Sequence, residues 1–253
     1  MSGQLGDDPL IKLSYEELRY ILHWASERGP RTGDPGIVLI GGWAVHVYNA
    51  WGGSIDIDLV MNARVKGTLM MHLRSERGYS KAGPEHMAGQ RVQRTTPFGP
   101  VKIDIASFEL QYPFEGTGAT LPMRQLKTES VEMSVEGMPV HVPARAMLLV
   151  MKMKAAWDRQ WRLDHGKSAD IVWESGKVVK DLADILALVD PERGGTGLNM
   201  PFLGMQLKAY PFLRDVLARA GSDPLGAGRY RIPQERASAM VERLLEMVRP
   251  SLR

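Results

Sequence analysis

The stretch that decides the fold of this chain reads Ile37-Val38-Leu39-Ile40-Gly41-Gly42-Trp43-Ala44, followed by Ser54-Ile55-Asp56-Ile57-Asp58-Leu59-Val60. An apolar run ends in two glycines, a short segment follows, and an alternating run then carries two carboxylates. This order predicts a strand, a glycine turn, a short helix and a second strand. Because side chains alternate along a strand, Asp56 and Asp58 are expected on one face. Ile55, Ile57 and Leu59 are expected on the opposite face, in the core.

The paired carboxylates predict a metal site. Two carboxylates held side by side repel each other unless a cation lies between them, and Mg²⁺ prefers one or two protein carboxylates together with phosphate oxygens. Asp104 lies between Ile103 and Ile105, the same unusual setting for a residue that forms strands poorly. We therefore expect Asp56, Asp58 and Asp104 to bind Mg²⁺ or Mn²⁺. The alternative is that the aspartates lie on exposed faces of edge strands.

The two glycines before the predicted helix are candidates for a phosphate contact. Gly41 and Gly42 would let a phosphate approach bare backbone N–H groups at the positive end of a helix dipole. The alternative is a simple tight turn, and the phosphate interpretation gains support only from the position of the pair after a strand and before the two aspartates. Ser54 either donates its hydroxyl to a phosphate or merely begins a strand.

Composition narrows the class of protein. The chain has 253 residues, of which 44% are hydrophobic and 24% charged, as in ordinary globular proteins. No stretch approaches the ~18 uncharged apolar residues of a membrane span, and no signal peptide is visible. The lack of cysteine excludes disulfides and thiolate chemistry and fits a reducing compartment. We expect a cytoplasmic protein with no membrane partner, and its net charge of +3 and pI near 9.1 are compatible with a phosphate-rich partner.

The predicted elements divide the chain into two halves. The first half is expected to contain a helix capped by Ser14 with Glu17 reaching back, a helix over Ala63–Arg77, and hairpins of Arg91–Thr96 with Val101–Ala106 and of Val131–Val135 with Met138–Val142. The second half is expected to contain helices over Ala144–Arg162, Lys177–Val189, Pro201–Ala220 and Pro233–Val248, with a loop over Gly166–Gly176. We predict an α+β (α/β) fold, with a mixed sheet and flanking helices in residues 1–143 and a helical domain in residues 144–253.

The decisive stretch resembles a known signature. Gly41-Gly42-Trp43-Ala44 followed by Ser54-Ile55-Asp56-Ile57-Asp58 is similar to the motif of the polymerase-β-like nucleotidyltransferase superfamily, and Asp104 resembles its third carboxylate. In the second half, Lys152, Ala155 and Arg159, with Lys180-Asp181 and Asp184-Ile185 downstream, resemble the helical region of AbiEii-type and related bacterial and archaeal nucleotidyltransferases. That branch includes toxins of toxin–antitoxin and phage-defence systems. The resemblance covers roughly residues 36–189.

The resemblance implies roles for these residues. It implies a catalytic nucleotidyltransferase domain at 1–143, followed by a helical domain that closes a cleft. Two divalent ions would be bound by Asp56, Asp58 and Asp104, and the phosphates of an NTP would rest on Gly41, Gly42 and the Ser54 hydroxyl. Lys152 matches a nucleotide- or phosphate-contacting lysine, and Asp181 matches a carboxylate of the site. From the residues alone, the Lys152 helix face and the spacing of Lys180 and Asp184 favour a solvated surface with i,i+4 pairs.

Two departures from the family pattern affect this interpretation. Related sequences carry an arginine two residues before the position that corresponds to Ser54, and this chain has Gly52 there. If this chain keeps the contact that such an arginine makes, we expect it from Arg64, Arg91 or Arg94. The stretch between Arg159 and Lys180 is also longer than in the family. We interpret it as a mobile loop over the site containing His165, Lys167 and Asp170.

The expected function is transfer of an NMP from an NTP to an acceptor, with release of pyrophosphate. Two metals would activate the attacking hydroxyl and stabilise the leaving pyrophosphate. The acceptor is left open between an RNA 3′ end (including tRNA), a protein hydroxyl and a small molecule, and the basic balance favours RNA. A toxin would also have a cognate antitoxin as partner. The alternatives are a non-catalytic nucleotide-binding or antitoxin-like module of the same fold, and an adenylyltransferase of the aminoglycoside-modifying kind.

Overall fold

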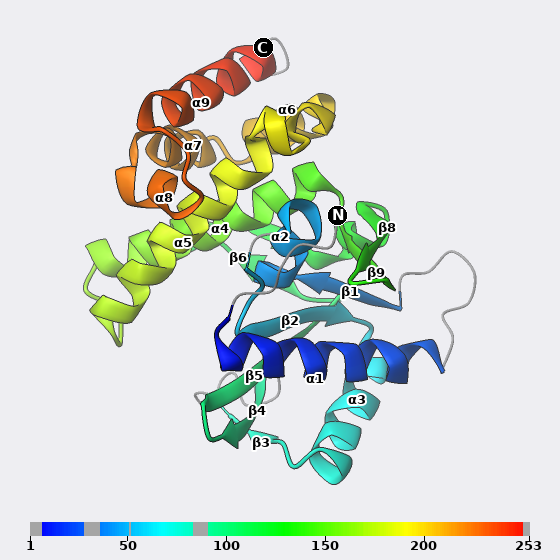
Figure 1. The fold of residues 1–253 in the computed structure, drawn as a ribbon. Helices are drawn as coiled ribbons and strands as arrows, with labels where there is room; N and C mark the ends of the chain where they lie inside the picture. The colour runs from blue at the N-terminus through cyan, green and yellow to red at the C-terminus, as the bar shows by residue number, and fades with distance from the viewer. Residues whose placement is uncertain (1–6, 28–35, 51, 83–90, 250–253) are drawn as a thin grey trace. The chain divides into compact units, whose positions relative to one another are not determined.

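The structure is a computed structural model that describes residues 7–27, 36–50, 52–82 and 91–249. The chain divides into two compact units (Figure 1). Unit 1 comprises Met1–Gln111 and Pro122–Ala144, and unit 2 comprises Tyr112–Leu121 and Arg145–Arg253. The sequence pattern placed a single boundary near Pro143 and did not indicate that residues 112–121 belong with the second unit.

Unit 1 is built on a seven-stranded mixed sheet in the order β3-β4-β5-β2-β1-β9-β8. Its elements are α1 (Pro9–Ser26), β1 (Ile37–Ile40), α2 (Gly41–Asn49), β2 (Asp56–Met61), α3 (Ala63–Glu76), β3 (Ser80–Lys81), β4 (Arg91–Thr96), β5 (Gly99–Ser107), η2 (Met123–Lys127), β8 (Ser130–Val135) and β9 (Met138–Pro143). The central strand β2 runs parallel to β5 and antiparallel to β1. The expected α+β class, the strand–helix–strand order around Gly41 and both hairpins are confirmed.

The two faces of this sheet differ in chemistry. Ile57 and Leu59 of β2 are fully buried, as are Leu18 and Ile21 of α1. Arg94 of β4 contacts Glu17 of α1, with 2.7 Å between the guanidinium and the carboxylate. Arg91 and Arg94 are three positions apart on one strand, so their side chains leave opposite faces. The aspartate face is therefore the face opposite to α1.

Unit 2 is helical apart from the strand pair β6 (Gln111–Pro113) and β7 (Thr120–Pro122), which joins the two units. Its helices are α4 (Arg145–Asp164), α5 (Ile171–Val189), η3 (Pro191–Arg193), η4 (Gly195–Gly197), α6 (Met200–Ala209), α7 (Leu213–Ser222), α8 (Pro224–Arg229) and α9 (Gln234–Val248). The second half of α5 is buried all round, because α4, α7, α8 and α9 pack against it. Within the described ranges no helix is both long enough and apolar enough to cross a membrane.

The start of the first helix was predicted wrongly. α1 begins at Pro9, and the carboxylate of Asp8 caps it by accepting from Leu10 N at 2.8 Å. An aspartate followed by proline at the first helical position is a stronger start signal than a capping box further along. Ser14 is instead buried inside the helix, where its hydroxyl accepts from Trp43 Nε1 at 3.0 Å. Glu17 is buried and binds Arg77 and Arg94.

Three further expectations are corrected. Ile55 precedes β2 and is 36% exposed rather than in the core. Ile171–Gly176 is the first part of α5 rather than a loop, because Asp170 caps the helix by accepting from Trp173 N at 2.9 Å. The single helix expected over Pro201–Ala220 is two helices, α6 and α7, separated at Tyr210-Pro211-Phe212. Gly29-Pro30, the glycine–proline pair expected to end the first helix, lies outside the described residues.

Candidate functional site

The predicted carboxylates of unit 1 lie on one face of the sheet. The register of β2 and β5 pairs Asp58 with Asp104 and Asp56 with Lys102. Residues paired across neighbouring strands share a face, as do residues two apart on one strand. Asp56, Asp58 and Asp104 are therefore neighbours on a face where each is partly accessible to solvent. We call these three residues together with Arg91 the carboxylate cluster.

Gly41 lies directly against this cluster. Its φ is +69°, a conformation that glycine adopts without penalty, and an added Cβ would lie 2.0 Å from Asp58 Oδ2. The register of β1 and β2 pairs the preceding residue, Ile40, with Asp58. Only a residue without a side chain therefore allows the start of α2 to come this close to the carboxylate. Gly42 and Ser54, the other predicted phosphate contacts, are both buried in unit 1.

The cation of the cluster is Arg91, on β4. The register pairs Arg91 with Asp104, and its guanidinium donates from Nε to Oδ1 at 2.5 Å and from a terminal nitrogen to Oδ2 at 2.6 Å. This is the bidentate geometry that makes arginine–carboxylate pairs strong. Of the three arginines expected to replace the one missing at Gly52, Arg91 is therefore the one that contacts a predicted site carboxylate. Arg94 contacts Glu17, and Arg64 is exposed on α3.

Arg91 experiences the charge of the whole cluster. Its hydrogen bonds to Asp104 raise the pKa of the guanidinium, burial opposes this, and the charges of Asp104, Asp56 and Asp58 raise the pKa further. The guanidinium thus occupies a position where the field of three carboxylates favours a positive charge.

The donor chemistry of the cluster fits a hard divalent cation, but the side chains as they stand do not complete a site for one. Carboxylate oxygens on adjacent strand positions are ligands that Mg²⁺ and Mn²⁺ accept. Both oxygens of Asp104 are engaged by Arg91, and across the described residues no group of three or more His, Asp or Glu side chains is arranged to hold a metal. Asp56 and Asp58 would hold such an ion, and Asp104 would join them once Arg91 moves away.

Unit 2 contains a second, buried group of charges. Lys152 of α4 lies between two carboxylates of α5, with Nζ 3.3 Å from Asp181 Oδ1 and 2.7 Å from Asp184 Oδ2. Lys180 donates to Asp184 Oδ2 at 2.9 Å, and Arg159 contacts Asp181. We call Lys152, Arg159, Lys180, Asp181 and Asp184 the lysine cluster. The structure thus brings the predicted Lys152 and Asp181 into direct contact within unit 2.

Burial and neighbouring charges both shift the pKa values of this cluster. Burial alone would raise the pKa of Asp184, but the ammonium groups of Lys152 and Lys180 outweigh it and hold that pKa well below its usual value. Burial lowers the pKa of Lys180, and the neighbouring charge of Lys152 acts in the same direction. Tyr230 donates to Asp184 Oδ1 at 2.9 Å. Nothing in the sequence pattern indicated Tyr230, which is 46 residues away from Asp184.

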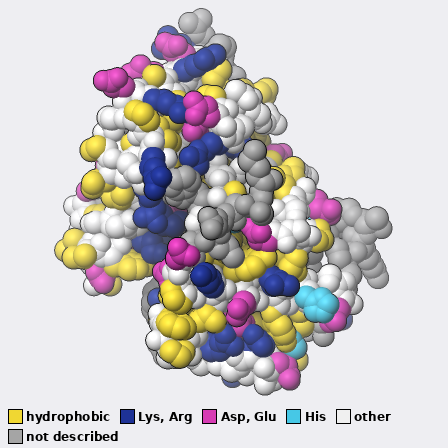
Figure 2. Space-filling model, viewed as in Figure 1, with side chains coloured by type: hydrophobic (Ala, Val, Ile, Leu, Met, Phe, Trp, Pro, Cys, Tyr) yellow, Lys and Arg dark blue, Asp and Glu magenta, His cyan; other side chains and the backbone are white. Residues whose placement is uncertain are grey.

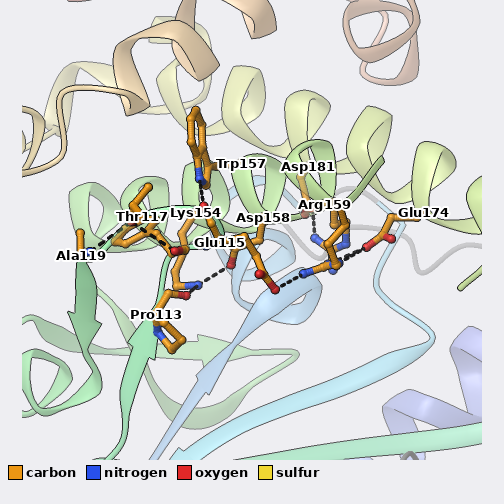
Figure 3. A network of polar contacts seen from close by, with 12 residues as sticks. Pro113, Glu115, Thr117, Ala119, Lys154, Trp157, Asp158, Arg159, Glu174 and Asp181 are labelled. Atoms are coloured by element: carbon orange, nitrogen blue, oxygen red, sulfur yellow. Dashed lines mark hydrogen bonds and ion pairs between the residues drawn. The ribbon is translucent and has the colours of Figure 1, made fainter. Parts of the chain in front are cut away.

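A polar network next to this cluster ties residues 112–121 to α4 (Figure 3). Lys154 donates to the carbonyl of Pro113 at 2.7 Å and contacts Asp158, which accepts from Glu115 N at 3.0 Å. Trp157 donates to the Glu115 carbonyl at 3.0 Å. Burial raises the pKa of Asp158, although Lys154 opposes this. Here the contacts join segments of the backbone, which indicates a structural role.

Comparisons with known proteins give structural similarity without a match in sequence families. No protein-family model matches the sequence, and no curated protein matches it significantly. Among solved structures, the chain is similar to the crystal structure of an antigenic nucleotidyltransferase-like protein from Paracoccidioides brasiliensis, at 14% sequence identity and a TM-score of 0.41. The match covers 84% of this chain and 93% of the other.

Proposed function

We propose that this protein is a metal-dependent nucleotidyltransferase that moves an NMP from an NTP to an acceptor. The observation that carries the proposal is the placement of Asp56, Asp58 and Asp104 on one sheet face, with the backbone of Gly41 held against Asp58. Carboxylates beside bare backbone N–H groups at a helix start suit a metal-bound polyphosphate. The resemblance of the Ile37–Val60 stretch to the polymerase-β-like signature supports the same chemistry.

The three aspartates of the carboxylate cluster and the three predicted phosphate contacts each have a role in this proposal. Asp56 and Asp58 hold Mg²⁺ or Mn²⁺, and Gly41, Gly42 and Ser54 receive the phosphates. The acceptor hydroxyl attacks the α-phosphorus, the bond to the bridging oxygen breaks, pyrophosphate leaves, and Asp104 takes the hydroxyl proton. The bound metal supplies Lewis-acid stabilisation of the charge that develops on the phosphate oxygens.

The lysine cluster supports a phosphate-binding role for unit 2. It combines three cations with two carboxylates, so one positive charge is in excess. Lys152 is only 7% exposed and is held by both aspartates. We therefore assign Lys152 and Asp181 to the support of Arg159 and Lys180, whose side chains are 24% and 22% exposed. In Figure 2 several Lys and Arg side chains lie close together over the region that α4 and α5 occupy in Figure 1.

For the acceptor we propose RNA, with tRNA as the first candidate. The net charge of +3 and pI near 9.1 favour a polyanionic partner. A polycationic aminoglycoside would require an acidic acceptor pocket instead. The similarity of the α4–α5 region to AbiEii-type proteins supports a cytoplasmic role in a toxin–antitoxin or phage-defence system, with a cognate antitoxin as protein partner.

The test is a transfer assay with each α-labelled NTP, Mg²⁺ or Mn²⁺, and total RNA. We expect label to move into RNA, and we expect the double substitution Asp56→Ala/Asp58→Ala to abolish transfer. Asp164→Ala, an exposed carboxylate at the end of α4, is the matched control and should retain transfer. Label in the protein itself would name a protein hydroxyl as acceptor.

Two outcomes would contradict the proposal. NTP binding without transfer to any acceptor would favour the non-catalytic nucleotide-binding or antitoxin-like module. Transfer that survives loss of both Asp56 and Asp58 would show that the carboxylate cluster is not the catalytic centre.

A further inference from the structure

Two carboxylates of unit 1 that bind arginine, Glu17 and Asp104, differ in accessibility. Glu17 is 1% exposed and is held by Arg77 at 2.5 Å and Arg94 at 2.7 Å. Removing a partner from such a contact leaves a buried charge, so the pair cannot open cheaply. Arg91 and Asp104 have side chains that are 29% and 30% exposed. Their contact can exchange with solvent ions while the fold stays intact.

The exposed contact also lies where like charges are concentrated. Asp58 and Asp104 are paired across β2 and β5, and Asp56 lies two positions away on the same face. The charges of Asp56 and Asp58 as well as that of Asp104 stabilise the positive charge of Arg91. Any cation that enters this face therefore meets carboxylates that Arg91 already neutralises in part.

We propose that Arg91 is a positioning residue that competes with the divalent cation for Asp104. Without metal, the guanidinium holds both oxygens of Asp104. A cation held by Asp56 and Asp58 would gain Asp104 as a further ligand if Arg91 released that carboxylate. This inference rests on the metal site of the proposed function and adds a step that links metal entry to the position of an arginine.

Once released from Asp104, the Arg91 guanidinium can bind a phosphate group. A guanidinium prefers planar, bidentate acceptors, and a phosphate group offers the same pair of oxygens as a carboxylate. Arg91 is thus able to exchange Asp104 for a phosphate of the nucleotide when the metal arrives. This would place a cation beside the phosphates although the family's usual arginine position is Gly52.

The experiment measures Mn²⁺ binding to the full chain by electron paramagnetic resonance, without nucleotide. Arg91→Gln removes the competitor, so we expect Mn²⁺ to bind roughly tenfold more tightly, which corresponds to a charged hydrogen-bond pair of typical strength. Arg91→Lys keeps the charge without the bidentate fork and should give an intermediate gain. Lys102→Gln removes one positive charge from a residue paired with Asp56 and should have the smaller effect of a general charge change.

The proposal is overturned if Arg91→Gln binds Mn²⁺ as the wild type does or more weakly, or if Lys102→Gln gives the same gain. The readout does not depend on turnover, so the two proposals can fail separately. Tighter Mn²⁺ binding by Arg91→Gln, together with no NTP transfer by the wild type, would support the role of Arg91 and contradict the proposed nucleotidyltransferase activity. NTP transfer by the wild type, together with the same Mn²⁺ affinity in Arg91→Gln, would support the enzyme activity and contradict the competition between Arg91 and the cation.

A second measurement follows the contact between Arg91 and Asp104 directly in the wild-type chain. The ¹⁵N resonance of the Arg91 side-chain Nε–H, assigned by its loss in Arg91→Lys, reports the hydrogen bond to Asp104 Oδ1. Titration with Mg²⁺ should shift this resonance toward the position of a solvent-exposed arginine. A resonance that stays in place while Mg²⁺ saturates the Asp56 side would show that Arg91 and the metal bind independently.

Discussion

The carboxylate cluster of unit 1 and the lysine cluster of unit 2 are built from the same kinds of groups but differ in burial and in charge balance. The first surrounds the Arg91 guanidinium with three carboxylates that remain partly exposed. The second surrounds two carboxylates, 4% and 2% exposed as residues, with three cations. An exposed excess of negative charge can be completed by a cation, whereas the buried carboxylates Asp181 and Asp184 are already held by the cations of their own cluster.

The largest expected effect is a loss of stability when the buried lysine cluster is disrupted. Asp184→Asn would leave Lys152 and Lys180 without their shared carboxylate, and breaking a buried pair costs about 3–5 kcal/mol. We expect the free energy of unfolding, measured with guanidinium chloride, to fall by that amount at pH 7. Asp164→Asn, an exposed control on α4, should change it by less than about 0.5 kcal/mol. A loss at Asp184 as small as the control's would remove the distinction between the two clusters.

Acid should weaken the same interaction. The pKa of Asp184 is lowered in the folded chain from a usual value of 3.8, so its stabilisation is present above that pH and is lost as the pH falls below it. The difference in unfolding free energy between wild type and Asp184→Asn should therefore be constant from pH 7 to about 5 and shrink below about 4. A difference that stays constant down to pH 3 would contradict the lowered pKa.

A smaller effect is expected where the backbone meets the carboxylate cluster. Gly41→Ala would place a methyl group on Asp58 Oδ2 and also strain a backbone with φ of +69°. Gly52→Ala is the matched control, because Gly52 has φ of +73° but open space around an added Cβ. Thermal unfolding should show a loss of about 1 kcal/mol for Gly52→Ala and about 1–3 kcal/mol more for Gly41→Ala. Equal losses would mean that Asp58 moves aside freely.

The smallest effect on stability is expected within the carboxylate cluster itself. Asp58→Asn removes a negative charge that Asp56 and Asp104 repel, so the unfolding free energy should change by less than about 1 kcal/mol and can rise. Mn²⁺ binding should be lost in the same variant. A loss of stability comparable to that of Asp184→Asn would show that this cluster is also structural.

Local patterns predicted much of unit 1, and the exceptions have physical causes. Alternation placed Ile57 and Leu59 in the core correctly, because both lie inside β2. It failed for Ile55, which precedes the strand and so escapes the alternation. The capping box at Ser14 was overridden by Asp8-Pro9, and the helix that Asp170 begins was hidden because its first residues, Ile171-Val172-Trp173, are exposed and apolar.

The site was harder to predict than the fold, because it depends on contacts between residues that are far apart in the sequence. The pairing of Asp58 with Asp104 follows from two strands whose register no local pattern specifies. Arg91 was one of three arginines that the sequence left open, and only the pairing of β4 with β5 shows that it contacts Asp104. Tyr230 and its bond to Asp184 come from the region after Met200, where the sequence carried no functional signal.

Residues 112–121 belong to unit 2, although the segments before and after them belong to unit 1. Neither unit is therefore encoded by one continuous stretch of the gene. The polypeptide passes between the units three times, at 111/112, 121/122 and 144/145. A gene fragment that ends at residue 144 would encode Phe114 without Tyr210 and Phe212, the rings that lie 4.7 Å and 5.1 Å from it. A fragment that begins at residue 145 would lack the Glu115 carbonyl, which accepts a hydrogen bond from Trp157. Recombination between homologous genes would therefore have to exchange the 112–121 loop together with the C-terminal segment, and a single crossover would yield mismatched hybrids.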